Sequence, residues 1–121
     1  MKKGIIALTV SFLAVSAAAQ QPVSADRFAD AVNHWNKEHG AQTYERYKPD
    51  RFREIADNIV AYQNADGGWP KNLDMLARLD PDSVKAALKP RHRLSTLDNA
   101  NVYTQVEDLS NVYLLTGDTL Y

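Results

Sequence analysis

Apolar residues recur every three to four positions along most of this chain, and that spacing constrains the fold more than any other feature. The clearest run opens after Pro49 and Asp50 and is terminated by Gly67 and Gly68. Its apolar face consists of Phe52, Ile55, Ala56, Ile59, Val60 and Gln63. No segment alternates with a period of two, and no Asn-Gly hairpin signal is present. The sequence therefore predicts an all-α fold.

Three further helices are predicted. The first covers residues 24–37, with Ser24 as N-cap and Gly40 at its end. The second is a looser helix over residues 74–89, interrupted at Pro81 and stopped by Pro90. The third covers residues 99–115, and Gly117 follows as the C′ residue. Its predicted apolar stripe is Val102, Val106, Leu109, Val112 and Tyr113.

The N-terminus has the pattern of a signal peptide. Lys2 and Lys3 precede a short apolar run, and three small residues, Ala17, Ala18 and Ala19, follow it. The run is shorter than the roughly 20 residues that span a bilayer, although a membrane anchor is the alternative interpretation. We expect cleavage after Ala19, no membrane association after cleavage, and a secreted or periplasmic protein.

Charge and composition exclude some classes of function. The formal net charge is −1 and becomes more negative when Lys2 and Lys3 are removed. No basic stripe remains to bind nucleic acid. The chain has no cysteine and hence no disulfide framework. Because Thr116-Gly117-Asp118 resembles the entry to another helix, we expect residues 20–121 to be the N-terminal part of a longer domain.

The first segment whose residues are suited to ligand binding is Gln63 to Asn72. Two glycines allow a tight turn after a helix, and Trp69 then offers a flat face on which a sugar ring could stack. Lys71 and Asn72 add a cation and an amide for carboxylates and hydroxyls. The alternatives remain open: Trp69 plugs the end of a helix pair, and Lys71 is a solvated surface charge.

The second segment is Ser95-Thr96-Leu97-Asp98-Asn99, which leads into Tyr103-Thr104-Gln105. Asp98 and Asn99 together supply the carboxylate and amide oxygens that a hard cation such as Ca²⁺ prefers. Ordinary helix capping by either residue is the alternative. The three histidines, His34, His39 and His92, lack metal-ligand spacing and are interpreted as surface or packing residues.

Together the two segments resemble polysaccharide lyase family 10, the pectate lyases. The similarity is carried by Gly67-Gly68-Trp69-Pro70-Lys71-Asn72, by Ser95-Thr96-Leu97-Asp98-Asn99 with Tyr103-Thr104-Gln105, and by Thr116-Gly117-Asp118. The resemblance implies helical hairpins of an incomplete (α/α) toroid, of which this chain holds the first units. It also implies calcium-dependent β-elimination of polygalacturonate.

The resemblance also assigns roles to residues. Asp98 is expected to bind Ca²⁺, with Asn99 beside it on the metal or the substrate. Trp69, Lys71 and Asn72 are expected to form or support the wall of the substrate groove. No catalytic residue is assigned in this chain, because the family's arginine base and its other calcium carboxylates correspond to positions beyond Tyr121. Residues 20–121 alone are therefore expected to be inactive.

Two other interpretations compete with the lyase. The chain could be a non-catalytic helical module that binds carbohydrate or another partner, since fold does not fix function. Gln63, Gly67 and Trp69 also match a short motif of terpene cyclases, but the acidic cluster that those enzymes need is absent from the sequence.

Overall fold

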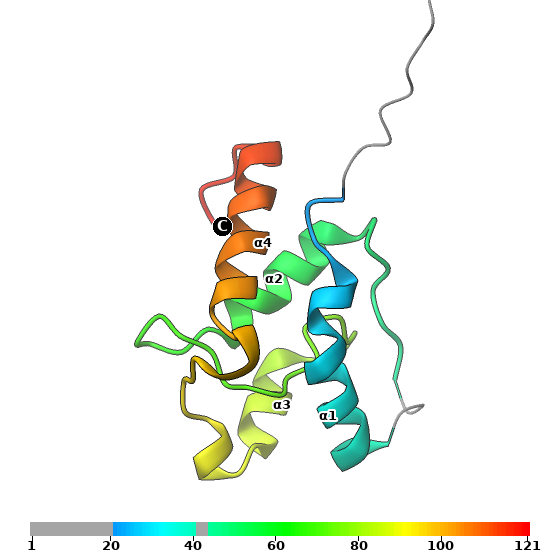
Figure 1. The fold of residues 1–121 in the computed structure, drawn as a ribbon, viewed down its shortest axis with the longest axis vertical. Helices are drawn as coiled ribbons and strands as arrows, with labels where there is room; N and C mark the ends of the chain where they lie inside the picture. Colours follow the sequence, from blue (N-terminus) through cyan, green and yellow to red (C-terminus); the bar gives the residue numbers. More distant parts are fainter. Residues whose placement is uncertain (1–20, 41–43) are drawn as a thin grey trace, which may run out of the picture.

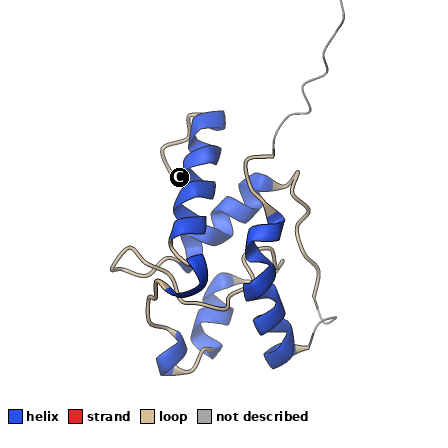
Figure 2. Cartoon of the chain, in the orientation of Figure 1, coloured by secondary structure: helices blue, strands red, loops and turns tan. Residues whose placement is uncertain are grey.

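The computed structural model of the chain describes residues 21–40 and 44–121. The helices of this part are α1 (Ala29–His39), α2 (Phe52–Tyr62), α3 (Pro81–Ala87) and α4 (Tyr103–Thr116), with the 3-10 turns η1 (Ala25–Phe28), η2 (Pro90–His92) and η3 (Asp98–Ala100). The described residues hold isolated β-bridges but no strand, which confirms the predicted all-α class (Figure 2). The expected signal peptide, residues 1–19, lies outside the described residues.

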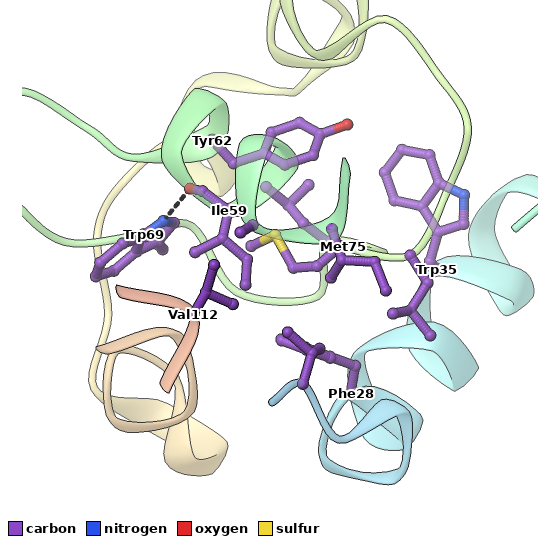
Figure 3. Packing of buried hydrophobic residues seen from close by; sticks show 12 residues of the cluster. Phe28, Trp35, Ile59, Tyr62, Trp69, Met75 and Val112 are labelled. Atoms are coloured by element: carbon purple, nitrogen blue, oxygen red, sulfur yellow. Dashed lines mark hydrogen bonds between the residues drawn. The ribbon is translucent and has the colours of Figure 1, made fainter. Parts of the chain in front are cut away.

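The helix α2 is central and packs against both α3 and α4 (Figure 1). Ile55, Ala56 and Ile59 on its predicted face are completely buried. Side chains from η1, from α1, from α4 and from the loop after α2 close around them (Figure 3). Each large apolar side chain buried in this way contributes about 1.5–3 kcal/mol, so the core fixes how the loops between the helices are placed.

The helix α2 ends at Tyr62, earlier than the predicted stop at the glycine pair. Gln63 is already extended, with φ −64° and ψ 135°, and its side chain is exposed rather than part of the apolar face. The Gln63 side-chain amide donates to the Gly67 carbonyl at 2.9 Å. The chain turns at Gly67, whose φ of 85° favours glycine.

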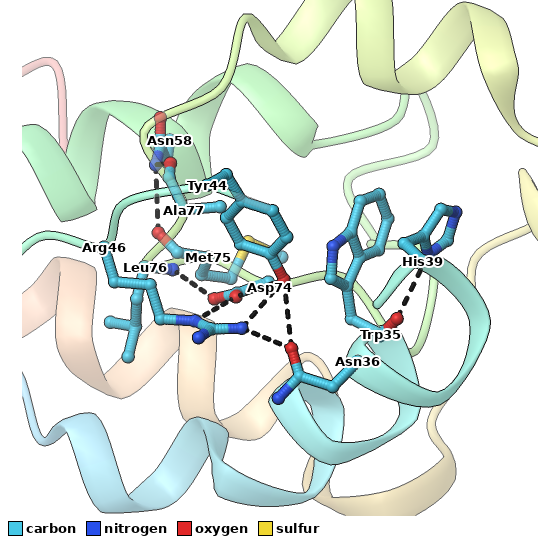
Figure 4. Close-up of polar contacts among 10 residues, drawn as sticks. All are labelled: Trp35, Asn36, His39, Tyr44, Arg46, Asn58, Asp74, Met75, Leu76 and Ala77. Carbon is cyan, nitrogen blue, oxygen red and sulfur yellow. Dashed lines mark hydrogen bonds and ion pairs between the residues drawn. The ribbon is translucent and has the colours of Figure 1, made fainter. Parts of the chain in front are cut away.

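The prediction of a helix over residues 74–89 is wrong in its first half. The backbone of this half pairs instead with an extended segment: Tyr47 N–H donates to the Leu76 carbonyl at 2.7 Å, and Arg78 N–H donates to Glu45 at 2.8 Å. Asp74 is buried beneath this pairing and forms an ion pair with Arg46 (Figure 4). A helix in this half would leave the Tyr47 N–H and the Glu45 carbonyl without these partners.

The second half of that prediction holds in modified form. Pro81 does not interrupt a helix but is the first residue of α3. Proline is well tolerated there, because the first N–H of a helix has no intrahelical partner. The Asp80 carboxylate accepts from Ser83 N–H at 3.0 Å and caps the helix. Pro90 then opens the turn η2.

The helix α1 ends at Gly40, as predicted, with φ 85° at that glycine. Gly117, at φ 69°, likewise ends α4 as expected. The face that α4 buries differs from the prediction, because only Val112 of the predicted stripe is fully buried and Val106 and Tyr113 are exposed. The buried positions of α4 are Thr104, Gln105, Asp108 and Val112.

Candidate functional site

The two motif segments lie against each other. Pro70 forms an antiparallel bridge with Ser95, and Thr96 N–H donates to the Trp69 carbonyl at 3.1 Å. The Asn101 side-chain amide donates to the same Trp69 carbonyl at 2.7 Å and to the Thr96 carbonyl at 2.9 Å. Backbone and amide hydrogen bonds thus fix the segments as one corner of the molecule.

The close approach of the segments depends on Gly68. A Cβ atom at this position would lie 2.7 Å from the Ser95 Cβ and 2.8 Å from its Oγ. In the space that glycine leaves, the Ser95 hydroxyl donates to Asp66 at 2.6 Å, and Gly68 N–H donates to the same oxygen at 3.0 Å. The Ser95 hydrogen bond lowers the pKa of the Asp66 carboxyl. The Asp66 carboxylate is therefore a structural acceptor.

Trp69 supports this corner from beneath. Only 1% of the side chain is exposed, and the indole N–H donates to the Ile59 carbonyl at 2.6 Å (Figure 3). The ring is therefore not available to stack on a sugar in this structure. Its remaining contribution to a site is to hold the backbone of the Lys71 loop against α2.

Lys71 and Asp98 meet at the surface of the corner. The Lys71 ammonium lies 2.7 Å from the Asp98 carboxylate, and each side chain is about half exposed, at 49% and 51%. Both residues line a small cavity of about 30 Å³, together with Asn72 and Asp30. Asp98 opens η3 and does not cap α4, whose N-cap position is Val102 and makes no side-chain cap. The alternative interpretation, in which Asp98 caps α4, is therefore wrong.

Asn72 and Asn99 flank this pair in the chain. Asn72 has a φ of 62°, a left-handed conformation that asparagine tolerates better than most residues. It is partly buried and lines the small cavity. Asn99 is the middle residue of η3, directly after Asp98. The corner therefore gathers the backbone of the predicted residues, with the side chains of Lys71, Asn72 and Asp98 on one cavity.

Gln105 is a further residue of this corner that was not predicted as a site residue from the sequence. Because both Asn101 amide hydrogens are donated to carbonyls, the Asn101 Oδ1 accepts from the Gln105 amide at 2.6 Å. This fixes the orientation of the Gln105 amide, whose Oε1 is buried without a hydrogen-bond partner among the described residues. Gln105 lines the small cavity. The four-residue spacing between Asn101 and Gln105 is the signal that could have revealed it.

The oxygens at this corner suit Ca²⁺ in kind but not in number. Asp98, Asp30 and Gln105 offer carboxylate and carbonyl oxygens around the small cavity, whereas Ca²⁺ takes six to eight oxygen ligands. The Lys71 ammonium also occupies the position on Asp98 that a cation would take. Within residues 21–40 and 44–121, no three His, Cys, Asp or Glu side chains converge as metal ligands. These residues alone do not make a calcium site.

A buried carboxylate lies on α4, outside the corner. Asp108 is 1% exposed, and its Oδ2 has no hydrogen-bond partner among the described residues. Burial raises the pKa of Asp108 to about 7, while the nearby Arg27 charge acts in the opposite direction. Arg27 itself is paired with Glu107. Nothing in the sequence pattern distinguishes Asp108 from an ordinary surface aspartate.

No family model, curated protein or solved structure matches this chain. In the part of the chain that the structure describes, no helix is both long and apolar enough to cross a membrane.

Proposed function

We propose that this chain is the N-terminal part of an exported pectate lyase similar to polysaccharide lyase family 10. Such an enzyme cleaves polygalacturonate by calcium-dependent β-elimination. The observation that carries the proposal is the contact between Lys71 and Asp98, 2.7 Å apart. These residues come from the two motifs that carry the family resemblance, and they line one cavity together.

In this proposal the corner meets both the sugar and the metal. Asp98 would supply one carboxylate to Ca²⁺ in place of its contact with Lys71, Asn99 would lie on the metal or the substrate, and Lys71 and Asn72 would bind carboxylate or hydroxyl groups of the uronate. Trp69 supports the groove wall without touching the sugar, in keeping with its burial. When bound, Ca²⁺ would withdraw charge from the uronate carboxylate and would make the proton on C5 more acidic. The resemblance assigns the base and the remaining calcium ligands to positions beyond Tyr121.

The finer architecture is part of the same proposal: helical hairpins of an incomplete (α/α) toroid. It is supported by the packing of α2 against both α3 and α4. The exposed apolar side chains of α4 offer a surface for a neighbouring helix pair, with Val106 at 50% and Leu114 at 78% exposed.

The experiment compares the product of a longer reading frame with this chain. We expect the longer protein to release unsaturated product from polygalacturonate, followed by ultraviolet absorbance, with Ca²⁺ and not with a chelator. Residues 20–121 alone should give no turnover. Asp98→Ala in the longer protein should abolish the response to Ca²⁺, whereas an unchanged response would remove Asp98 from the site.

The second candidate is a non-catalytic module that binds carbohydrate or another partner. The exposed face of α4 favours it, because Tyr103 is 69% and Leu115 is 62% exposed. Affinity electrophoresis in gels containing polygalacturonate separates the two functions. Retardation by a longer protein that never releases unsaturated product would support the module.

A further inference from the structure

A larger cleft adjoins the candidate site. Its volume is about 320 Å³, within the range of small-molecule sites, and it lies between the end of α1 and the segment over residues 88–96. Lys71 and Asn72 line both this cleft and the small cavity. The cleft therefore shares two lining residues with the small cavity at the Lys71–Asp98 corner, and its other lining residues are separate.

Cationic and imidazole side chains line this cleft. Arg91 Nε lies 3.0 Å from His92 Nε2, so the guanidinium and the imidazole are held together. His39 is stacked on Trp35 with ring centroids 3.8 Å apart. Its Nδ1 lies 3.1 Å from the Trp35 carbonyl, which can only accept a hydrogen bond. Nδ1 is therefore the protonated nitrogen, and Nε2 is the second polar atom that His39 can offer to a ligand.

The rest of the lining favours a ligand that is more than a bare anion. Glu38 places one carboxylate among these groups, which disfavours phosphate and suits a hydroxyl donor. Leu88 and Leu94 form an apolar wall against which the C–H face of a ring can pack, and Leu94 is 69% exposed. Ser95 and Asn72 supply further polar groups.

We infer that this cleft binds a hydroxylated organic acid of sugar-ring size, with its carboxylate on Arg91 and Lys71. An arginine is well suited to this, because its planar fork recognises carboxylates in two-point contacts. A uronic acid as the natural ligand rests on the function proposed above. The chemistry of carboxylate plus hydroxyls rests on the cleft alone, so a different hydroxy acid would meet the same groups.

The test is an NMR titration of the chain in a chelator, with digalacturonate as the probe. Amide signals of residues 88–96 and of Lys71 should shift. The neutral disaccharide galactobiose, and inorganic phosphate, should each bind at least about fivefold more weakly. Arg91→Gln should weaken digalacturonate binding about tenfold, the loss expected for a charge-assisted hydrogen bond. Lys89→Gln is the matched control, since it removes a charge from the same segment without touching the cleft, and should change Kd less than twofold.

Leu94→Glu gives a second variant, because an exposed position tolerates the change and the new acid faces the ligand. It should weaken binding by at least about fivefold. The inference is overturned if Arg91→Gln and Lys89→Gln behave alike, if galactobiose binds as well as digalacturonate, or if the shifts lie outside the cleft. The titration contains no Ca²⁺ and involves no turnover. Loss of binding here would therefore leave the proposed lyase standing, and an inactive longer protein would leave the cleft standing.

If gluconate, an open-chain hydroxy acid, produces the same shifts and the same dependence on Arg91 while digalacturonate does not, the cleft assignment is supported. The uronic acid would then be excluded as its ligand.

Discussion

The Lys71 ammonium lies 2.7 Å from the Asp98 carboxylate and joins two loops that are 27 residues apart in sequence. Both side chains are about half exposed, so the pair contributes little to stability, on the order of 0.2–1 kcal/mol. Other contacts between the loops, such as the Asn101 hydrogen bonds, are independent of it. The fold therefore determines the position of the Lys71–Asp98 ion pair, and the ion pair contributes little to the stability of the fold.

This difference predicts how Asp98 variants behave. Asp98→Asn should change the free energy of unfolding by less than about 1 kcal/mol, measured by urea denaturation of the chain. Lys71→Met should have an equally small effect. If the function proposed above holds, Asp98→Asn in a longer protein should nevertheless remove the response to Ca²⁺. A loss of several kcal/mol in the chain would mean that Asp98 has a structural role.

Gly68 should be less replaceable by alanine than the neighbouring Gly67. Gly68→Ala would bring a Cβ atom to 2.7 Å from the Ser95 Cβ, and overpacking of this kind costs about 1–3 kcal/mol. Gly67→Ala meets no atom within 4 Å, and its cost comes from the φ of 85° alone, about 1 kcal/mol. The measurement is the midpoint of urea unfolding for each variant.

Ser95→Gly provides the control for this comparison. Combined with Gly68→Ala, it removes the clashing atoms and should recover part of the loss, whereas combined with Gly67→Ala it should add its own cost. Equal behaviour of the two double variants would show that crowding against Ser95 is not what selects glycine at position 68.

The two tryptophans should respond differently to replacement by phenylalanine. Trp69→Phe removes the indole donor from the buried Ile59 carbonyl, which costs about 1–3 kcal/mol in addition to the lost volume. Trp35 is buried too, but its indole N–H has no hydrogen-bond partner among the described residues. Trp35→Phe should therefore destabilise the chain by about 1 kcal/mol less than Trp69→Phe, measured by urea denaturation. The reverse order would contradict the assigned hydrogen bond.

The existence of the helices could be predicted from apolar spacing, and Gly40 and Gly117 correctly marked where two of them end. The non-helical segment around Asp74 could not, because it depends on pairing with residues 45–47, which are distant in sequence. The predicted buried face of α4 was wrong, because Gln105 and Asp108 are buried in place of Val106 and Tyr113. Apolar spacing does not report a polar face that the fold encloses.

For the candidate site, the sequence identified the segments but not their contacts. That Lys71 would pair with Asp98 follows from the packing of both loops on the Trp69 backbone, through long-range hydrogen bonds that no local pattern encodes. The sequence left open whether Trp69 stacks on a sugar or plugs the core. The contact between its indole and the Ile59 carbonyl on α2 decides this, and that contact is known only from the fold.

Burial raises the pKa of the Asp108 carboxyl to about 7. An unfolded aspartate has a pKa near 3.9, so between about pH 4 and pH 7 the folded chain binds more protons than the unfolded chain. The stabilisation of the fold by the protonated Asp108 carboxyl is therefore fully present below about pH 4, and it is lost as the pH rises through about 7. Asp108→Asn should remove this component. Because the two pKa values differ by about three units, the variant should gain on the order of 4 kcal/mol of stability relative to the wild type between pH 4 and pH 8.

The measurement is urea denaturation of the wild type and Asp108→Asn across pH 4 to 8, and the difference between them isolates Asp108 from the other carboxylates. Glu107→Gln is the matched control, because Glu107 is the adjacent carboxylate and its pairing with Arg27 lowers its pKa instead. Because the pKa of Glu107 is lowered in the fold, that variant should be less stable than the wild type by a nearly constant amount above about pH 5, and the deficit should shrink only as the pH falls below about 4. If the Asp108→Asn difference stays constant across the range, Asp108 is ionised in the fold at acidic pH and its burial is compensated by Arg27 and the Ser24 backbone.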